Sequence, residues 1–163
     1  MLHVRPTVPG DLPVIRSLYE KGIAHMRAEG NTVQWQGIDS PAAKIPGDIE
    51  KGISYVVVDG EDTVHGTFAF LLGEDPTYSV IEEGAWPDDL PYGTIHRIVS
   101  DQETRGILQA AVEFCRTRTD RLRLDTHKSN RTMRAAAAKN GFVYAGIIHV
   151  SDGTPRLAFT KTF

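Results

Sequence analysis

The sequence predicts an α/β fold, in which flanking helices cover a mixed, mostly antiparallel sheet with a central pair of parallel strands. Residues 92–100 and 122–126 have the pattern of strands, and a helix over residues 106–116 separates them. A strand–helix–strand unit of this length makes a right-handed crossover and places its two strands parallel. β-Branched runs joined by turn residues elsewhere favour antiparallel hairpins, and Gly141 ends a further helix.

The first third of the chain predicts one short strand and two helices. A strand over residues 2–5 precedes a helix that Asp11 should cap and Gly30 should end. Apolar residues recur on one face of this helix, at the spacing of a helix packed on a core. A second helix begins at Pro41, and Pro46 should bend or break it.

The rest of the chain predicts strands with two helices between them. Strands over residues 55–58 and 64–72 form a hairpin, and a long acidic and aromatic segment, residues 73–91, leads to the strand at 92–100. After the strand at 122–126, a helix over residues 130–140 and strands over 143–148 and 157–161 complete the order. The helix over 106–116 should bury one face, made of Ile107, Leu108, Ala111, Val112 and Cys115.

Composition predicts one domain, over residues 1–163, that needs no disulfide or metal to fold. Cys115 is the only cysteine, which excludes an intramolecular disulfide and a thiolate metal cluster. A net charge of -3 excludes a general attraction to nucleic acid or to an anionic membrane. The first residues lack the pattern of a signal peptide, and no segment approaches the ~20 apolar residues of a membrane-spanning helix. We therefore expect a cytoplasmic protein.

Two segments carry a resemblance to a known family. Ile95 to Ser100 forms a strand, and Arg105 to Leu108 forms a helix start that bears a glycine. A helix start offers free backbone N–H groups and the positive end of the helix dipole to an anion. Together with the segment from Asn130 to Phe142, this order resembles the core of the GNAT acetyltransferase superfamily. In that family the helix start holds the pyrophosphate of coenzyme A, and the resemblance extends more loosely over nearly the whole chain.

The resemblance implies an N-acyltransferase that moves an acetyl group from acetyl-CoA to a primary amine of a small molecule or peptide. It implies no metal, and it leaves a monomer and a homodimer equally open. The residues that it implies for contact with acetyl-CoA are Ile98, Val99, Ser100, Arg105, Gly106, Ile107, Leu108, Asn130 and Met133. Asn130 is explained equally well as a helix cap, and both roles are compatible.

Three positions differ from the family pattern. Its phosphate signature has Gln or Arg, then Gly, then Gly or Ala; Gly106 matches the signature, but this chain has Glu103 and Leu108 at the other two positions. Many members carry a tyrosine on the last helix for protonating the departing thiolate, and this chain has Ala137 there. These differences keep two alternatives open. One is a catalytically impaired acyl-CoA-binding or regulatory module of the same fold, and the other is a sensor that binds another acyl-CoA.

Three side chains are candidates for proton transfer. His96 lies on the strand that the resemblance places beside the acetyl group, where a base would serve an amine acceptor; a hydrogen-bonded histidine of the sheet is the alternative. His127 is its rival, because Asp125 should share its face of the strand and raise its pKa. This pair has no third ligand for a metal. Tyr144 is the nearest tyrosine to Ala137 in sequence, and we favour solvent over Tyr144 as the acid.

The acceptor site is expected in the irregular segments of the chain. Residues 34–36 supply one part and residues 73–91 the other. Acidic side chains beside aromatic rings suit a protonated amine through charge and cation–π attraction. The residues concerned are Asp75, Tyr78, Glu82, Glu83, Trp86, Asp88 and Asp89. An exposed acidic loop is the alternative interpretation.

Overall fold

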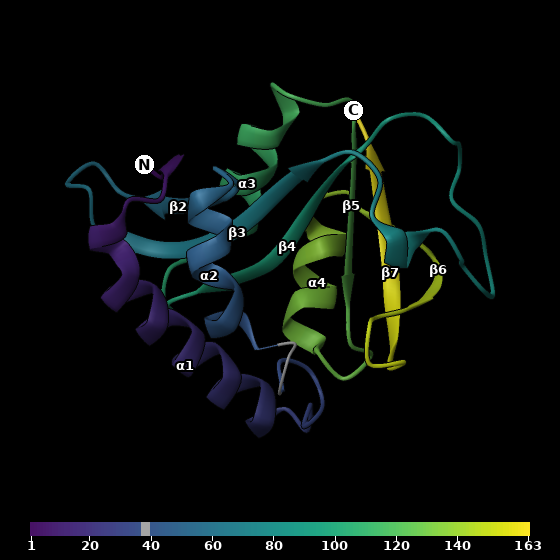
Figure 1. The fold of residues 1–163 in the computed structure, drawn as a ribbon, viewed down its shortest axis with the longest axis horizontal. Coiled ribbons are helices and arrows are strands. Elements are labelled where there is room, and N and C mark those ends of the chain that lie inside the picture. Colours follow the sequence, from purple (N-terminus) through teal and green to yellow (C-terminus); the bar gives the residue numbers. More distant parts are fainter. Residues whose placement is uncertain (37–39) are drawn as a thin grey trace.

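The protein is built around a seven-stranded sheet (Figure 1). The computed structural model describes residues 1–36 and 40–163. The elements follow in the order β1 (His3–Pro6), α1 (Leu12–Ala28), α2 (Pro41–Glu50), β2 (Ser54–Val58), β3 (Val64–Leu72), β4 (Gly93–Ser100), α3 (Ile107–Arg116), β5 (Arg121–Thr126), α4 (Arg131–Lys139), β6 (Val143–His149) and β7 (Pro155–Thr162). Short 3₁₀ turns lie at Pro9–Asp11 and Pro76–Tyr78. This is the order that the sequence predicts.

The strands lie in the order β1-β2-β3-β4-β5-β7-β6. All neighbouring strands are antiparallel except β4 and β5, which are parallel. The helix α3 makes the crossover between these two strands. The prediction of a mixed, mostly antiparallel sheet with a central parallel pair is therefore confirmed.

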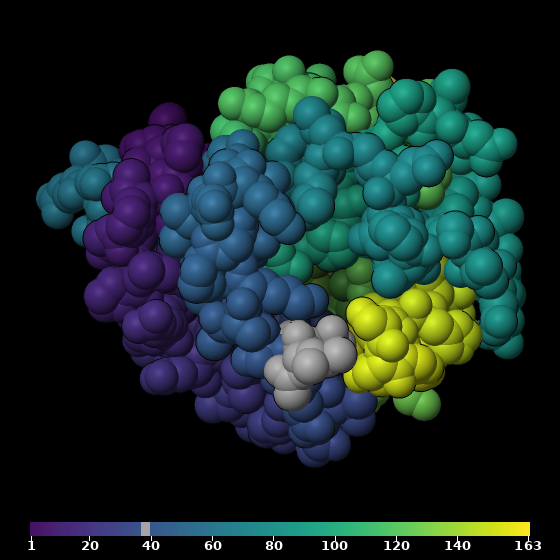
Figure 2. Space-filling model, in the orientation of Figure 1, coloured from purple at the N-terminus to yellow at the C-terminus, as the bar shows by residue number. Residues whose placement is uncertain are grey.

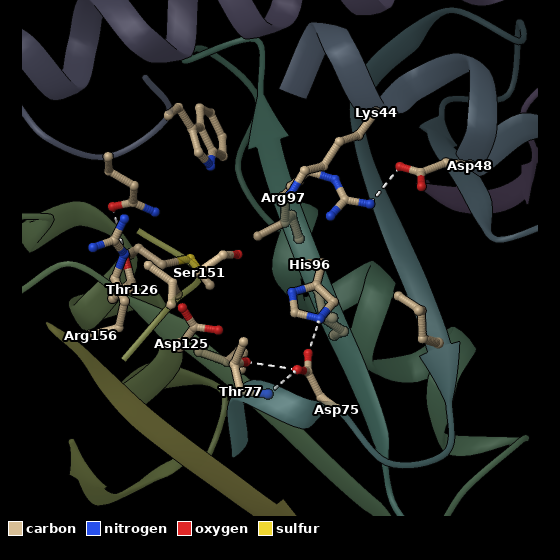
Figure 3. Close-up of a pocket in the computed structure, with 18 of the residues that line it drawn as sticks. Lys44, Asp48, Asp75, Thr77, His96, Arg97, Asp125, Thr126, Ser151 and Arg156 are labelled. Carbon is tan, nitrogen blue, oxygen red and sulfur yellow. Dashed lines mark hydrogen bonds and ion pairs between the residues drawn. The ribbon is translucent and has the colours of Figure 1, made fainter. Parts of the chain in front are cut away.

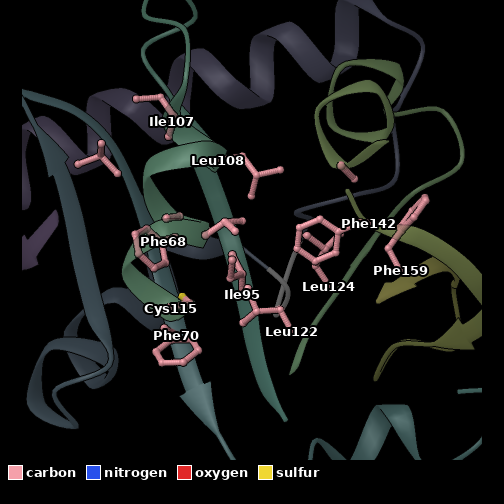
Figure 4. Packing of buried hydrophobic residues seen from close by; sticks show 14 residues of the cluster. Phe68, Phe70, Ile95, Ile107, Leu108, Cys115, Leu122, Leu124, Phe142 and Phe159 are labelled. Atoms are coloured by element: carbon pink, nitrogen blue, oxygen red, sulfur yellow. The ribbon is translucent and has the colours of Figure 1, made fainter. Parts of the chain in front are cut away.

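Helices cover both faces of the sheet, and the alternation of side chains in β2 separates two cores. Val57 packs beneath α3 and α4 with a large cluster of apolar residues (Figure 4). Val56 and Val58 point the other way and pack against Ile15 of α1 and Ile45 of α2. The predicted inner face of α3 is confirmed, since all five of its residues are buried. Among the helices of the described residues, none has the length and apolar character needed to cross a membrane.

The parallel strands β4 and β5 pair only at one end. The paired positions are Gly93 with Leu122 and Thr94 with Arg123, and beyond them the strands diverge (Figure 1). In the diverging part β4 contains a bulge, because its pairing with β3 shifts between Thr67 and Ala69. From Ile95 onward, no strand of the described residues pairs with the edge of β4 that faces β5.

Two details of the helices differ from the prediction. The helix α2 continues through Pro46 rather than breaking there, because the proline removes only one backbone donor and Ile45 anchors the helix in the core. Asp11 does not cap α1 with its side chain. Its carboxylate instead pairs with Arg5 at 2.9 Å and accepts the N–H of Val8 at 2.9 Å, closing the preceding 3₁₀ turn.

Candidate active site

The divergence of β4 and β5 opens into a cavity of about 600 Å³, which we call the main cavity. Its walls come from α2, β4, β5, the loop after α1 and the loop between β6 and β7. Figure 2 shows the hollow in this face of the molecule, between α2 and the β6–β7 loop. A side cavity of about 130 Å³ lies between α1, the end of β4, α3 and α4.

The two cavities are adjacent, because they share lining residues: Met26, Trp35, Ile98, Asn130 and Met133. Ile98 belongs to the open edge of β4, and Asn130 and Met133 lie at the start of α4. The two adjacent cavities, which we together call the passage, lie along the split in the sheet, the side cavity toward α3 and the main cavity toward α2. Such a passage suits a long, thin ligand that meets a second ligand in the main cavity.

His96 projects from β4 into the main cavity and forms a pair with Asp75 (Figure 3). Its Nε2 lies 2.8 Å from Oδ2 of Asp75, and Oδ1 of Asp75 accepts the N–H and hydroxyl of Thr77 at 2.9 and 2.7 Å. Burial opposes the charge of Asp75, but the hydrogen bonds from His96 and Thr77 outweigh it and lower the pKa of this carboxyl to about 2. An ionised carboxylate only accepts hydrogen bonds, so Nε2 of His96 carries the proton. In the neutral imidazole, Nδ1 then has a free lone pair.

Asp125 lines the same cavity but interacts with Tyr78 rather than with His127. The hydroxyl of Tyr78 donates to Oδ1 of Asp125 at 2.6 Å. Burial and the Asp125 charge raise the pKa of Tyr78 well above its ordinary value, so this hydroxyl keeps its proton. The ring of Tyr78 also lies beside that of His96, with 6.2 Å between the centroids.

The expectation that Asp125 raises the pKa of His127 is wrong. The strand β5 ends at Thr126, so the alternation of side chains does not extend to His127, which begins the next turn. Its Nδ1 accepts the N–H of Ser129 at 3.1 Å. Burial, together with the charges of Arg156 and Lys128, lowers the pKa of His127, and this side chain lines neither cavity.

Neither Tyr144 nor Ala137 brings a proton donor to the split. Tyr144 is half exposed on β6, at the outer edge of the sheet, where its ring packs edge-on against Phe159 at 6.0 Å. Ala137 is fully buried in the core under α4. Both residues lie outside the linings of the main and side cavities.

The start of α3 has open backbone donors. Gly106 adopts a left-handed conformation, with φ of 86°, and occupies the N-cap position. Within the described residues, nothing accepts the N–H groups of residues 106–109. The preceding turn already holds an anion, because Oδ1 of Asp101 accepts the N–H groups of Glu103 and Thr104 at 2.9 and 2.7 Å. The donors that remain open suit a phosphate group.

The residues predicted to contact acetyl-CoA fall into four groups. Ile98, Asn130 and Met133 line both cavities, whereas Val99, Ser100 and Leu108 line the side cavity alone. Arg105 and Gly106 line a separate groove between α3 and β1, and Ile107 packs in the core. Asn130 also caps α4, since its Oδ1 accepts the N–H of Met133 at 3.1 Å. Their contacts with acetyl-CoA stay predictions.

Of the segments expected to build the acceptor site, only parts reach the main cavity. Gln34 and Trp35 line it, as do Asp75 and Thr77. Trp86 and Asp88 do not, because Trp86 packs 4.0 Å from the guanidinium of Arg123 and Asp88 pairs with Arg121 at 2.9 Å. These two contacts fasten the acidic segment to β5.

Several polar residues of the main cavity are not among those predicted from the sequence: Lys44, Asp48, Arg97, Thr126, Ser151 and Arg156. Lys44 and Asp48 stand four residues apart on α2, a spacing that places them on one helix face and offers a signal in retrospect. Arg97 offers no such signal. It follows His96 directly in β4, and strand alternation would turn it away from the cavity.

Solved structures match this fold over nearly the whole chain. A GNAT-family acetyltransferase from Streptococcus agalactiae is 30% identical with a TM-score of 0.88, and the match covers 99% of this chain and 95% of that one. GNAT-family acetyltransferases from Bacillus cereus (18% identity, TM-score 0.66, covering 99% and 97%) and Listeria monocytogenes (21%, 0.65, 99% and 95%) share the fold. No family sequence model and no curated protein sequence matches the chain significantly. The identity and coverage of the Streptococcus match show that this chain belongs to the GNAT family of acetyltransferases.

Proposed function

We propose that this acetyltransferase moves an acetyl group from acetyl-CoA to a primary amine of a small molecule or peptide. The observation that carries the proposal is the pair of His96 and Asp75 in the wall of the main cavity. A histidine whose orientation is set by an ionised carboxylate has the arrangement of a general base. An amine must lose a proton to complete the transfer, and this base stands beside the passage.

The passage through the split fits the donor. The open N–H groups of residues 106–109 would hold the pyrophosphate, and Ile98 and Met133 would contact the thin arm that leads to the thioester. When bound, acetyl-CoA supplies the acetyl group as a reactive thioester. The open edge of β4 offers backbone N–H and C=O groups along the same path.

Residues of the main cavity can accept the proton that the amine loses. Nδ1 of His96 would accept it, while Nε2 stays bonded to Asp75, whose charge balances the imidazolium. Tyr144 and Ala137 lie outside the cavities, so we assign protonation of the departing thiolate to solvent in the main cavity.

One observation favours the alternative of an acyl-CoA-binding module without turnover. Asp101 occupies two of the N–H groups in the turn before α3, and Glu103 adds a second negative charge there. Both features reduce the attraction of this turn for a pyrophosphate. A module of this kind would bind an acyl-CoA and acetylate no amine.

The test begins with titration calorimetry of acetyl-CoA, free CoA and longer acyl-CoAs, followed by thiol release with a panel of amines. We expect His96→Gln, which keeps a donor for Asp75, to lower the rate about 10²–10⁴-fold at unchanged acetyl-CoA affinity. His127→Asn is the matched control, since its amide oxygen can still accept from Ser129, and we expect little change. A normal rate in His96→Gln would overturn the base assignment. Acetyl-CoA binding without transfer to any amine would favour the module.

A further inference from the structure

We infer that the acceptor carries a carboxylate besides its reactive amine, as an amino acid does, and that Arg97 receives this carboxylate. The inference rests on the proposed function and specifies its substrate class. It starts from the observation that four consecutive residues of β4, Ile95 to Ile98, all line the main cavity. In a regular strand, His96 and Arg97 would face opposite sides of the sheet.

The bulge in β4 brings both side chains to the same cavity. Arg97 adopts a left-handed conformation, with φ of 53°, which costs an ordinary residue about 1 kcal/mol. The hydroxyl of Tyr19 donates to the carbonyl of Arg97 at 2.7 Å and secures this conformation. A bulge of this kind re-aims a side chain, and strained backbone of this kind is concentrated at functional sites.

The guanidinium of Arg97 is positioned and still has donors to offer. Its Nη2 lies 2.5 Å from Oδ2 of Asp48, and its side chain is 15% exposed. Within the described part of the chain, no group accepts from Nε or Nη1 of Arg97. The planar fork of a guanidinium matches the two oxygens of a carboxylate in bidentate geometry.

The main cavity has charged groups of both signs. Its described lining carries four cations (Lys44, Lys51, Arg97 and Arg156) against three carboxylates (Asp48, Asp75 and Asp125). The whole chain, by contrast, has a net charge of -3. Each of the three carboxylates is already bonded, to Arg97, His96 and Tyr78 respectively. Lys44 and Arg156 also have partners, so the guanidinium of Arg97, with Nε and Nη1 open to the described residues, is the group that can receive an added carboxylate.

The two walls of the cavity suit the two ends of such an acceptor (Figure 3). Lys44 and Asp48 lie one turn apart on α2, Lys51 follows as the C-cap of this helix, and the guanidinium of Arg97 bonds to Asp48 in this wall. His96 and Asp75 form the other wall. An amine placed at His96 would leave its carboxylate within reach of the neighbouring Arg97.

The experiment compares amino acids with the amines formed from them by decarboxylation: tryptophan with tryptamine, histidine with histamine, and lysine with cadaverine. With acetyl-CoA as donor, kcat/KM should favour the amino acid about ten- to hundredfold in at least one pair. In Arg97→Gln this ratio should fall toward one, chiefly through KM of the amino acid. Arg97→Lys keeps the positive charge but lacks the planar fork, so its ratio should lie between those of the wild type and Arg97→Gln. Arg16→Gln, an exposed arginine of α1, is the matched control and should keep the wild-type ratio.

A ratio near one in every pair, or a ratio that survives Arg97→Gln, would overturn the inference. If no pair is acetylated, titration calorimetry of the same pairs in the presence of free CoA still decides the inference, while the thiol-release panel separately decides the proposed function. In that case the amino acid should bind more tightly than its amine, and Arg97→Gln should remove the difference. Equal binding would overturn it.

Discussion

His65 holds Asp101 in the turn between β4 and α3, with Nδ1 of the imidazole 2.9 Å from a carboxylate oxygen. The other ring nitrogen lies 2.8 Å from Asp59, in the turn between β2 and β3. Hydrogen bonds to these two carboxylates raise the pKa of His65. Through these two contacts His65 ties the turn between β4 and α3 to the hairpin of β2 and β3.

We therefore expect a stability contribution from His65 that depends on pH. Because its folded pKa is raised, the contribution should be complete below about pH 6.5, the unfolded value, and should be lost as pH rises through the folded pKa. His65→Gln should cost about 1–3 kcal/mol at pH 6, or roughly 3–10 °C in Tm. Thermal unfolding of both proteins from pH 5 to 9 measures this difference. His149→Gln, an exposed histidine, is the control, and a pH-independent difference for His65→Gln would contradict the expectation.

Asp75→Asn should slow acetyl transfer by roughly tenfold or more while acetyl-CoA affinity stays unchanged. The asparagine amide can donate to Nε2 of His96, which moves the ring proton to Nδ1 and removes the free lone pair there. Initial rates of thiol release at saturating acetyl-CoA measure the effect. Asp88→Asn, in the same segment but outside the main cavity, should keep the wild-type rate. Equal rates in the two variants would show that Asp75 does not determine which ring nitrogen of His96 carries the proton.

Gly106→Glu should weaken CoA binding several-fold beyond the effect of Gly106→Ala. The space around Gly106 is open, with the nearest atoms 3.9 Å from an added Cβ, so alanine costs about 1 kcal/mol through its φ of 86° alone. Glutamate adds a negative charge beside the open N–H groups. Gly30 has a φ of 87° and open surroundings at the end of α1, so Gly30→Glu is a matched control. If calorimetry gives the same affinity for free CoA in Gly106→Glu and Gly30→Glu, the start of α3 does not bind the pyrophosphate.

Ala137→Tyr should destabilise the protein without raising its rate. Ala137 is fully buried in the core, so a phenol there overpacks it, at a cost of about 1–3 kcal/mol. Urea unfolding gives the stability, and thiol release gives the turnover. Ala137→Ser, which adds one small polar atom, separates the effect of volume from that of polarity. A faster enzyme would show that the phenol reaches the departing thiolate.

Tyr144→Phe should leave both turnover and stability close to the wild type. The hydroxyl forms no hydrogen bond in the described structure, and the ring contact with Phe159 survives the change. Steady-state rates across the pH range of activity provide the measurement. A hundredfold loss of turnover would assign the acid to Tyr144 after all.

Local patterns in the sequence predict the fold because buried apolar residues recur at the spacing that is typical of a helix or of a strand. The spacing of Ile107, Leu108 and Cys115 identifies the inner face of α3, and the crossover rule identifies the parallel pair. The candidate site depends on contacts that no local pattern contains. Asp75 reaches His96 from 21 residues away, and the bulge turns Arg97 against strand alternation. The loss of alternation at His127 likewise follows from where β5 ends, which tertiary packing decides.

The divergence of β4 from β5 also has a mechanical consequence. The sheet consists of two half-sheets, β1 to β4 and β5 to β7, and only two residue pairs join their backbones. The two halves share one core under α3 and α4, but we expect amide hydrogens on the free edge of β4 to exchange with solvent more readily than those on its β3 edge. A ligand that lies along that edge supplies the missing pairing, so the occupancy of the split and the stiffness of the whole molecule rise together.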